Sequence, residues 1–225
     1  MMRLARFLAI AGIASRRHAE ELIRQGSVSV NGAVVTTVGT VVDETKDTVM
    51  YDGTQVSAEE YVYYLLNKPA GYTCSVSDVH AKKLVTALVP KSPRVYPVGR
   101  LDRETEGLLL LTNDGDLTQK LTHPKHAVKK VYEVTTERAI ENEDFKALRN
   151  GVRLTEGLAK IDALQRIASN RLRITIHQGW NRQIRRMLGT RGHKVEHLIR
   201  VQEGNLRLAD TATGSFRKLN KEDII

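Results

Sequence analysis

The sequence predicts an α+β fold, in which a small α/β module precedes a larger domain built on a mixed, mostly antiparallel sheet. Helical and strand-like periodicities both occur, but they do not follow the strict β–α–β alternation that is typical of a parallel sheet. A short polar stretch at residues 57–60 separates the first segment from the rest of the chain. The chain has no repeat with a period of about 20–50 residues and no low-complexity tract, which excludes repeat architectures.

The composition favours a folded protein with a polyanionic partner. Hydrophobic residues make up 41% of the 225 residues, which is enough for a core and argues against global disorder. The 35 Lys and Arg residues outnumber the 26 Asp and Glu residues, and the net charge is +9. Basic chains of this size often bind nucleic acid, although the charge alone is equally compatible with a basic protein that has no such partner.

Cys74 is the one cysteine of the sequence, so neither an intramolecular disulfide nor a zinc site built from several thiolates can form. We interpret it as a small, half-buried apolar side chain. No apolar run is long enough to span a bilayer, and polar residues interrupt the first six residues too early for a signal peptide. We therefore expect a cytoplasmic protein without a membrane partner, and a monomer as the default state.

Two helices are predicted at the start of the chain. Apolar residues spaced i, i+3, i+4 and i+7 predict the first, which Gly12 ends. Ser15 is a good N-cap for the second, and Gly26 is its expected end. Arg16 and Arg17 fall in the first turn of the second helix, where the helix dipole disfavours each cation by about 0.3–1 kcal/mol. With the exposed N–H groups they would form an anion site, unless they are simply solvated surface arginines.

A hairpin is predicted to follow these helices. Val28 and Val30 alternate with polar residues, and Asn31-Gly32 is a strong signal for a two-residue turn. A further strand-like stretch continues to about Tyr51, and Asp52-Gly53 turns the chain again.

The segment 1–58 resembles the S4 RNA-binding module. The resemblance rests on residues 3–8 (RLARFL), 12–17 (GIASRR), 19–23 (AEELI) and 26–32 (GSVSVNG). The segment holds six basic and six acidic residues, and because the basic ones come early and most acidic ones late, we expect one basic face. In that family the helices and the hairpin turn bind structured RNA. The contacts that the resemblance implies are Arg3, Arg16, Arg17 and Asn31.

The larger segment, 59–225, is predicted to mix strands and helices. Its first strand, at residues 61–66, is rich in aromatic and branched residues, and the Pro and Gly residues at 68–71 end it. Further strands are expected at 107–112, 130–136, 159–167 and 171–177. Helices are expected at 115–121, 141–150 and 181–190.

A carboxylate on a short loop is the first candidate for chemistry. Asp102 lies between Arg100 and Arg103, and these cations favour its charged form. The apolar run 108–111 behind it reads as a buried strand that would hold the loop rigidly. A fixed carboxylate in a basic cleft can act as a nucleophile or a base on a sugar or base ring. A purely structural ion pair is the alternative for a loop aspartate between arginines.

Four stretches resemble the RsuA/RluB class of bacterial ribosomal RNA pseudouridine synthases. Residues 99–102 (GRLD), continuing through 105–115 (TEGLLLLTNDG), match the active-site motif of the class. Residues 66–71 (LNKPAG), 129–134 (KKVYEV) and 179–187 (GWNRQIRRM) match its other motifs. With the S4-like segment in front, the resemblance covers nearly the whole chain. It implies a pseudouridine synthase catalytic domain over residues 59–225.

The resemblance implies a role for each residue of a catalytic trio. Asp102 would be the essential carboxylate, which either adds covalently to the ribose C1′ or the uracil ring, or assists cleavage of the glycosidic bond. Tyr132 would lie against the target uracil, with its ring as a stacking face and its hydroxyl as a proton acceptor; the alternative is a tyrosine packed in the core. Arg185 would pair with Asp102. The uracil reattaches through C5 without redox change or external group, so we expect no cofactor and no metal.

Residues 179–200 form a strongly basic segment. They carry six cations and one acid, Glu196, for a net charge of +5. In a helix from Asn181, Arg182, Arg185 and Arg186 would share one side at i, i+3 and i+4. The resemblance implies that the cations other than Arg185 meet RNA phosphates, whereas a solvated charged face is the alternative. Arg100 would fill the gap left by a flipped nucleotide. The RNA contacts expected in this larger domain are Arg100, Arg103, Lys129, Arg182 and Arg186.

Two other functions compete with the enzyme. A non-catalytic RNA-binding or ribosome-assembly protein of the same fold would not need Asp102, whose charge repels phosphate, so the trio of Asp102, Tyr132 and Arg185 favours catalysis. A nucleotide glycosidase usually needs two neighbouring carboxylates, and no motif of that kind supplies a second one. Glu104 and Glu106 lie close to Asp102 in the sequence, but the sequence does not give their geometry.

The expected partner is ribosomal RNA, free or in an assembling subunit. Members of the class act on either ribosomal subunit. The stretch 94–102 (RVYPVGRLD) looks more like the members that act on large-subunit RNA, so we expect that target, with small-subunit RNA as the alternative.

Overall fold

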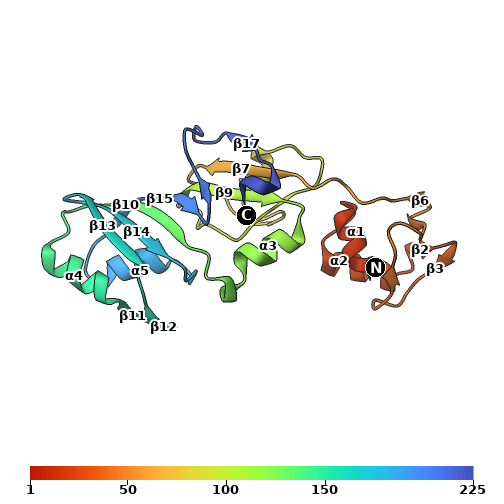
Figure 1. The fold of residues 1–225 in the computed structure, drawn as a ribbon, viewed down its shortest axis with the longest axis horizontal. Coiled ribbons are helices and arrows are strands. Elements are labelled where there is room, and N and C mark those ends of the chain that lie inside the picture. The colour runs from red at the N-terminus through yellow and green to blue at the C-terminus, as the bar shows by residue number, and fades with distance from the viewer. Residues whose placement is uncertain (225) are drawn as a thin grey trace. The chain divides into compact units, whose positions relative to one another are not determined.

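The computed structural model describes residues 1–224, and the chain divides into two compact units (Figure 1). The small unit contains residues 1–61 together with Ser92–Arg94, and the large unit contains residues 62–91 and those from Val95 onward.

The small unit contains the two helices and the hairpin that the sequence predicts. Ser15 caps the second helix by accepting a hydrogen bond from the His18 N–H at 3.3 Å. Asn31 and Gly32 both have positive φ angles, 52° and 82°, as a two-residue hairpin turn requires. The helices are α1 (Leu4–Ile10) and α2 (Arg16–Arg24). The strands are β1 (Met2–Arg3), β2 (Val28–Val30), β3 (Ala33–Val34), β4 (Val41–Val42), β5 (Val49–Tyr51) and β6 (Thr54–Gln55).

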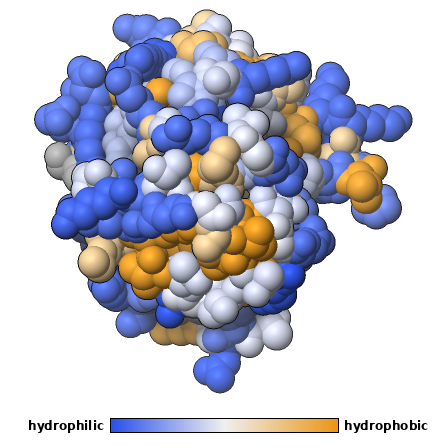
Figure 2. Space-filling view, turned by 90° about the vertical axis from the view of Figure 1, so that its right-hand side faces the viewer, coloured by the Kyte–Doolittle hydropathy of each residue, from blue (hydrophilic) through white to orange (hydrophobic). Residues whose placement is uncertain are grey.

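The stretch from the hairpin to Tyr51 differs from the continuous strand expected. β3 ends after two residues, and β4 leaves the hairpin sheet to pair with β1. The remaining strands form a four-stranded antiparallel sheet in the order β3-β2-β5-β6. The apolar residues that this break leaves exposed include Val34 and Val41. Figure 2 shows one face of the molecule, where hydrophobic side chains reach the surface in separate patches between hydrophilic ones.

The large unit is built on a nine-stranded sheet whose main path runs β13-β14-β10-β15-β9-β7-β17. Every pair in it is antiparallel except β9 with β15, which is parallel, so the predicted mixed, mostly antiparallel sheet is confirmed. Its strands are β7 (Tyr63–Lys68), β8 (Tyr96–Pro97), β9 (Glu106–Thr112), β10 (Lys130–Thr136), β13 (Ala163–Ala168), β14 (Arg171–Ile176), β15 (Val195–Glu203), β16 (Leu206–Arg207) and β17 (Phe216–Lys218).

The helices of the large unit agree with the predicted ones to within two residues at each end. The predicted strand 159–167 is wrong as a single element, because it is divided between the end of one hairpin and β13. None of the helices in residues 1–224 is both long and apolar enough to cross a bilayer. The helices are α3 (Gly115–Thr122), α4 (Asn142–Asn150) and α5 (Gln183–Gly189), and the hairpin is formed by β11 (Val152–Leu154) and β12 (Gly157–Ala159). Short 3-10 turns lie at Val85–Leu88, Pro124–His126 and Lys221–Asp223.

The parallel contact between β9 and β15 brings two backbones unusually close. Gly107 is opposite Arg200 in the register, and a Cβ atom on Gly107 would lie 2.4 Å from the Arg200 carbonyl oxygen. Gly107 also has a φ angle of 98°, which L side chains rarely adopt. The glycine therefore lets β15 approach the strand that directly follows the loop of Asp102. Buried leucines of β7 and β9 face clusters on both sides of this sheet.

Candidate active site

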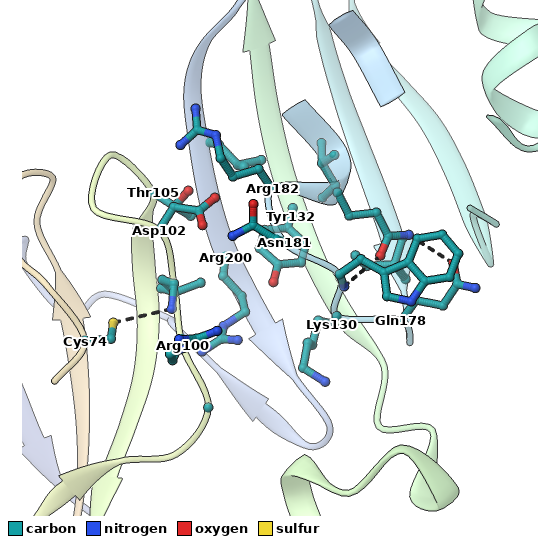
Figure 3. Close-up of a pocket in the computed structure, with 18 of the residues that line it drawn as sticks. Cys74, Arg100, Asp102, Thr105, Lys130, Tyr132, Gln178, Asn181, Arg182 and Arg200 are labelled. Carbon is teal, nitrogen blue, oxygen red and sulfur yellow. Dashed lines mark hydrogen bonds between the residues drawn. The ribbon is translucent and has the colours of Figure 1, made fainter. Parts of the chain in front are cut away.

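A cleft of about 1060 Å³ opens in the large unit. Its walls come from the loop before β9, from β10 and β15, and from the segment between β14 and α5 (Figure 3). Figure 3 shows the carboxylate of Asp102 facing the part of the cleft where Asn181 and Tyr132 lie. The polar and charged residues that line the cleft are Thr73, Ser75, Asp78, Arg100, Asp102, Thr105, Thr122, Lys130, Tyr132, His177, Gln178, Asn181, Arg182, Gln183, Arg200 and Glu203.

The loop that carries Asp102 is anchored on both sides of the carboxylate. The Asp102 carbonyl oxygen accepts a hydrogen bond from the Thr105 N–H at 3.0 Å, which closes a turn. Leu101 is buried, and its N–H donates to the sulfur of Cys74 at 3.4 Å. Thr105 is buried as well, whereas Asp102 itself stays partly exposed. The loop therefore presents the carboxylate to the cleft from a fixed backbone.

Lys68, the last residue of β7, holds this loop through hydrogen bonds. Its side chain is fully buried, and its ammonium group donates to the carbonyl oxygens of Arg103 at 3.2 Å, Thr105 at 2.7 Å and Pro69 at 3.1 Å. The Gly71 N–H also donates to the Arg103 carbonyl, at 2.7 Å. Burial lowers the pKa of Lys68. The stretch 66–71, known from the sequence only as a motif, thus holds the backbone around Asp102.

Arg185 acts on the same loop, but not as predicted. Its guanidinium donates to the carbonyl oxygens of Glu104 and Val195, each at 3.2 Å. Among the ion pairs of the described residues none joins Arg185 to Asp102, so the expected direct pair is wrong. Burial lowers the pKa of Arg185, and neighbouring Arg182 adds to this effect, while Asp102 and Glu104 oppose it.

The arginines around α5 do not share one helical face. Arg182 has a φ angle of 48° and lies before the first turn of α5, so the predicted i, i+3, i+4 set is wrong. The backbone turns there, and Arg182 reaches Glu104 in an ion pair of 2.8 Å. That hydrogen bond lowers the pKa of Glu104. Arg186 instead makes two hydrogen bonds with the carboxylate of Glu156, at 2.9 and 2.7 Å.

The segment before α5 is held in place by Gln183. This buried side chain donates to the Gln178 side-chain oxygen at 3.0 Å and accepts from the Trp180 N–H at 3.3 Å. The Gln178 oxygen also accepts from the Lys160 N–H at 3.0 Å. The wall of the cleft around Asn181 is therefore fixed by side-chain hydrogen bonds.

The floor of the cleft is formed by charged residues of β10 and β15. Tyr132 is 9% exposed and lies opposite Arg200, which is 1% exposed. Lys130 lies opposite Glu203. Arg200 was expected, with the other cations of residues 179–200, to meet phosphate on the surface, and this is wrong because its side chain is buried opposite Tyr132.

The structure brings four of the predicted residues to one cleft. Asp102, Tyr132, Arg100 and Arg182 line it. Lys130 lines it in place of Lys129, because Lys130 and Tyr132 are two residues apart on β10 and so project from the same face of the strand. The predicted residues of the large unit outside the lining are Arg103, Lys129, Arg185 and Arg186.

The predicted RNA contacts of the small unit differ in how their side chains are used. Arg3, Arg16 and Arg17 are exposed. Asn31 instead uses both polar atoms within the unit, since it donates to Asp47 and accepts from the Thr48 N–H, each at 2.9 Å.

Glu203 and Lys68 are the site residues that the sequence did not assign, and Arg200 was expected only as a phosphate contact. Alternation over 195–203 groups Arg200 with Glu196 and Gln202, so no local signal predicts that its side chain is buried. For Lys68, the motif at 66–71 marked the stretch, but no local signal predicts a buried ammonium group.

Comparison with known proteins gives a consistent picture. The model of the RNA pseudouridylate synthase family matches residues 62–190, and the S4 domain model matches residues 2–49. The chain is 42% identical to ribosomal large subunit pseudouridine synthase B of Bacillus subtilis, over 100% of this chain and 94% of that protein. It is 38% identical to an uncharacterized RNA pseudouridine synthase of Aquifex aeolicus, over 99% of this chain and 92% of that protein.

A solved structure agrees with these sequence matches. A crystal structure described as a pseudouridylate synthase superposes with a TM-score of 0.70 at 28% identity, covering 100% of this chain and 98% of that one. The cleft, the family match over the large unit and the S4 match over the small unit together show that this chain belongs to the RNA pseudouridylate synthase family.

Proposed function

We propose that this RNA pseudouridine synthase isomerises one or a few uridines of ribosomal RNA in the large ribosomal subunit, with Asp102 as the catalytic carboxylate. The full-length similarity to a synthase named for the large subunit supports the choice of substrate. The observation that carries the proposal is the cleft, in which a carboxylate on a rigid loop faces a tyrosine inside a basic wall. We expect the enzyme to act in the cytoplasm, on ribosomal RNA that is free or part of an assembling subunit.

The reaction is an isomerisation that balances within the nucleotide. The N1–C1′ bond breaks, the uracil turns in the cleft, and a C5–C1′ bond forms. The C5 proton then leaves, which restores the C5–C6 double bond, and N1 gains a proton. No electron or group comes from outside, so the proposed reaction needs no cofactor.

Each role follows from where the side chain lies. Asp102 acts at the sugar side, where its charge supports cleavage of the glycosidic bond. Tyr132 gives the uracil a flat face to lie against and an oxygen that accepts the C5 proton. Arg100, exposed at the cleft, takes the place that the flipped nucleotide leaves in its stack. Arg185 holds the Asp102 loop through the Glu104 carbonyl.

We further propose that the S4-like module, residues 1–58, grips the folded RNA around the target. Arg16 and Arg17 lie at the N-terminal end of α2, where backbone N–H groups point outward. Among residues 1–224, neither belongs to an ion pair, whereas Arg24 at the other end of α2 lies 3.8 Å from Glu20. The free guanidiniums therefore favour phosphate at the first turn.

Replacing Arg16 or Arg17 with glutamine is expected to weaken RNA binding at a step before catalysis. Each change removes one phosphate contact, so the slope of log affinity against log salt falls by about one. The turnover rate at saturating RNA stays unchanged. Binding titrations at several salt concentrations measure this. Arg24→Gln is the matched control, and an equal effect from that variant would show that the first turn of α2 has no special part in binding.

Pseudouridine mapping of ribosomal RNA tests the proposed function. Ribosomal RNA is compared between cells with the wild-type gene, cells without it, and cells that carry Asp102→Asn. We expect one uridine of large-subunit RNA, or a few neighbours, to lose modification in both altered strains. Loss at a small-subunit site would correct the target, and the absence of any change in ribosomal RNA would refute the ribosomal substrate.

A further inference from the structure

Two facing residue pairs form a buried charge network on the floor of the cleft. In the register of β10 and β15, Tyr132 is opposite Arg200 and Lys130 is opposite Glu203. Facing residues on antiparallel strands project to the same side of the sheet. All four residues line the cleft. The network therefore lies where Tyr132 would meet a base.

The Arg200 guanidinium is bonded to β9 and paired with Glu203, and its Nη2 makes no hydrogen bond. Its Nε donates to the Leu108 carbonyl oxygen at 2.8 Å, which fixes the guanidinium against β9. Its Nη2 lies 3.2 Å from a Glu203 oxygen but makes no hydrogen bond with it. A guanidinium has five N–H donors, so a residue this deeply buried with an unbonded Nη2 is unusual. This charged group lies opposite Tyr132 in the register of β10 and β15.

The charges around Tyr132 come from three elements. Burial raises the pKa of Tyr132; Arg200 on β15 opposes this, while Glu203 on β15 and Asp102 before β9 add to it. Lys130 lies on the same strand as Tyr132 and 3.7 Å from Glu203. Burial acts to lower the pKa of Arg200, but Glu203 and Tyr132 together raise it, and Cys74 adds to their effect. Arg200 is thus a firmly charged group that faces the phenol.

We propose that Arg200 is a positioning residue for Tyr132, which holds the phenol in the cleft and stabilises the negative charge on its oxygen. This inference rests on the proposed function, in which the Tyr132 oxygen accepts the C5 proton. In that step the C5–H bond breaks, its electron pair restores the C5–C6 double bond, and the proton moves to the phenolate oxygen. The proton later exchanges with water, and N1 takes one from water.

The effect on rate follows from the fraction of phenolate. Below the pKa of the tyrosine, that fraction falls about tenfold for each unit by which the pKa rises. A higher pKa also makes the remaining phenolate a stronger base. This gain raises the rate by less than the loss of phenolate lowers it, because the rate of proton transfer depends only in part on the basicity of the acceptor. A cation that stabilises the phenolate therefore speeds the step.

A double-mutant cycle on the full-length enzyme tests the proposal. The four proteins are wild type, Arg200→Gln, Tyr132→Phe and the double variant, assayed for kcat and KM on a ribosomal RNA fragment. We expect Arg200→Gln to lower kcat by about tenfold or more, with KM within about threefold, in line with general base catalysis. We expect no further loss in the Tyr132→Phe background. Arg200→Lys is expected to restore part of the rate, and Arg207→Gln, an exposed arginine on β16, is the control.

The outcomes distinguish a failure of the positioning role of Arg200 from a failure of the proton-acceptor role of Tyr132. If the losses of the two single variants multiply in the double variant, Arg200 does not act through the Tyr132 hydroxyl and the inference is overturned. If Tyr132→Phe keeps full kcat, the proton-acceptor role in the proposed function fails first, and the inference falls with it.

The pH profile gives a second readout, and the Glu203→Gln part of it does not depend on the stability of Arg200→Gln. Glu203→Gln keeps Arg200 and removes the anion that opposes phenolate formation. The midpoint at which kcat rises with pH is expected to move to lower pH in Glu203→Gln and to higher pH in Arg200→Gln. A purely structural role would not produce opposite shifts, so shifts in the same direction, or no shift, would overturn the inference.

Discussion

Replacing Asp102 with asparagine is expected to lower kcat by at least about 1000-fold, since removal of an essential nucleophile or base commonly costs that much or more. The side chain keeps its size and its partly exposed position, so the loop, anchored by Lys68 and Cys74, is expected to keep its conformation. RNA affinity should stay within about threefold, because removing one negative charge from a basic cleft does not weaken phosphate contacts. Single-turnover assays and binding titrations on the same RNA measure both values.

Asp78→Asn is the control for the loss of charge alone. Asp78 also lines the cleft, but it is exposed and no family motif includes it. We expect near wild-type turnover from this variant. A collapse of RNA binding or of folding in Asp102→Asn would instead mean that Asp102 is structural, and the assigned role would be wrong.

Replacing Gly107 with alanine is expected to destabilise the large unit by roughly 3 kcal/mol or more, which places it among severe substitutions. Two costs combine. The φ angle of 98° is unfavourable for alanine, and the new Cβ would lie 2.4 Å from the Arg200 carbonyl oxygen, which is backbone and cannot rotate away. β9 and β15 must separate, and this moves Asp102 relative to Arg200. Urea unfolding monitored by circular dichroism measures the loss.

Gly214→Ala separates the two costs. Gly214 has a φ angle of 81°, but a Cβ atom there would meet nothing within 4 Å. We expect only the conformational cost, about 1–2 kcal/mol. Equal losses at the two positions would mean that the close approach of β9 and β15 contributes nothing to stability.

The elements that the sequence predicted well are those with a strong local signal. The cap at Ser15, the turn at Asn31-Gly32 and the alternation over 130–136 each depend on residues close together in the chain, and the structure has all three. The elements it predicted poorly lack such a signal. The short edge strands β16 and β17 depend on a neighbouring strand for their hydrogen bonds.

The arginine segment shows how a good local pattern can mislead. Arg182, Arg185 and Arg186 have helical spacing, but Arg182 adopts a left-handed conformation before α5 begins. Its ion pair with Glu104 joins residues 78 positions apart. Spacing within one segment cannot reveal a partner so distant, so the predicted face was wrong although the helix was right.

The sequence by itself determined the α+β class, the family resemblance and the candidates Asp102 and Tyr132, because motifs and periodicity are recorded in neighbouring residues. Only the tertiary structure decided that Lys68 and Arg185 hold the Asp102 loop through its carbonyl oxygens, and that Arg200 is buried opposite Tyr132. The Arg200 bond to Leu108 spans 92 positions. Such contacts arise when strands that are distant in the sequence pair in the large unit. A buried charged group is costly unless a carbonyl or carboxylate oxygen accepts its hydrogen bonds, so its partners are set by the packing.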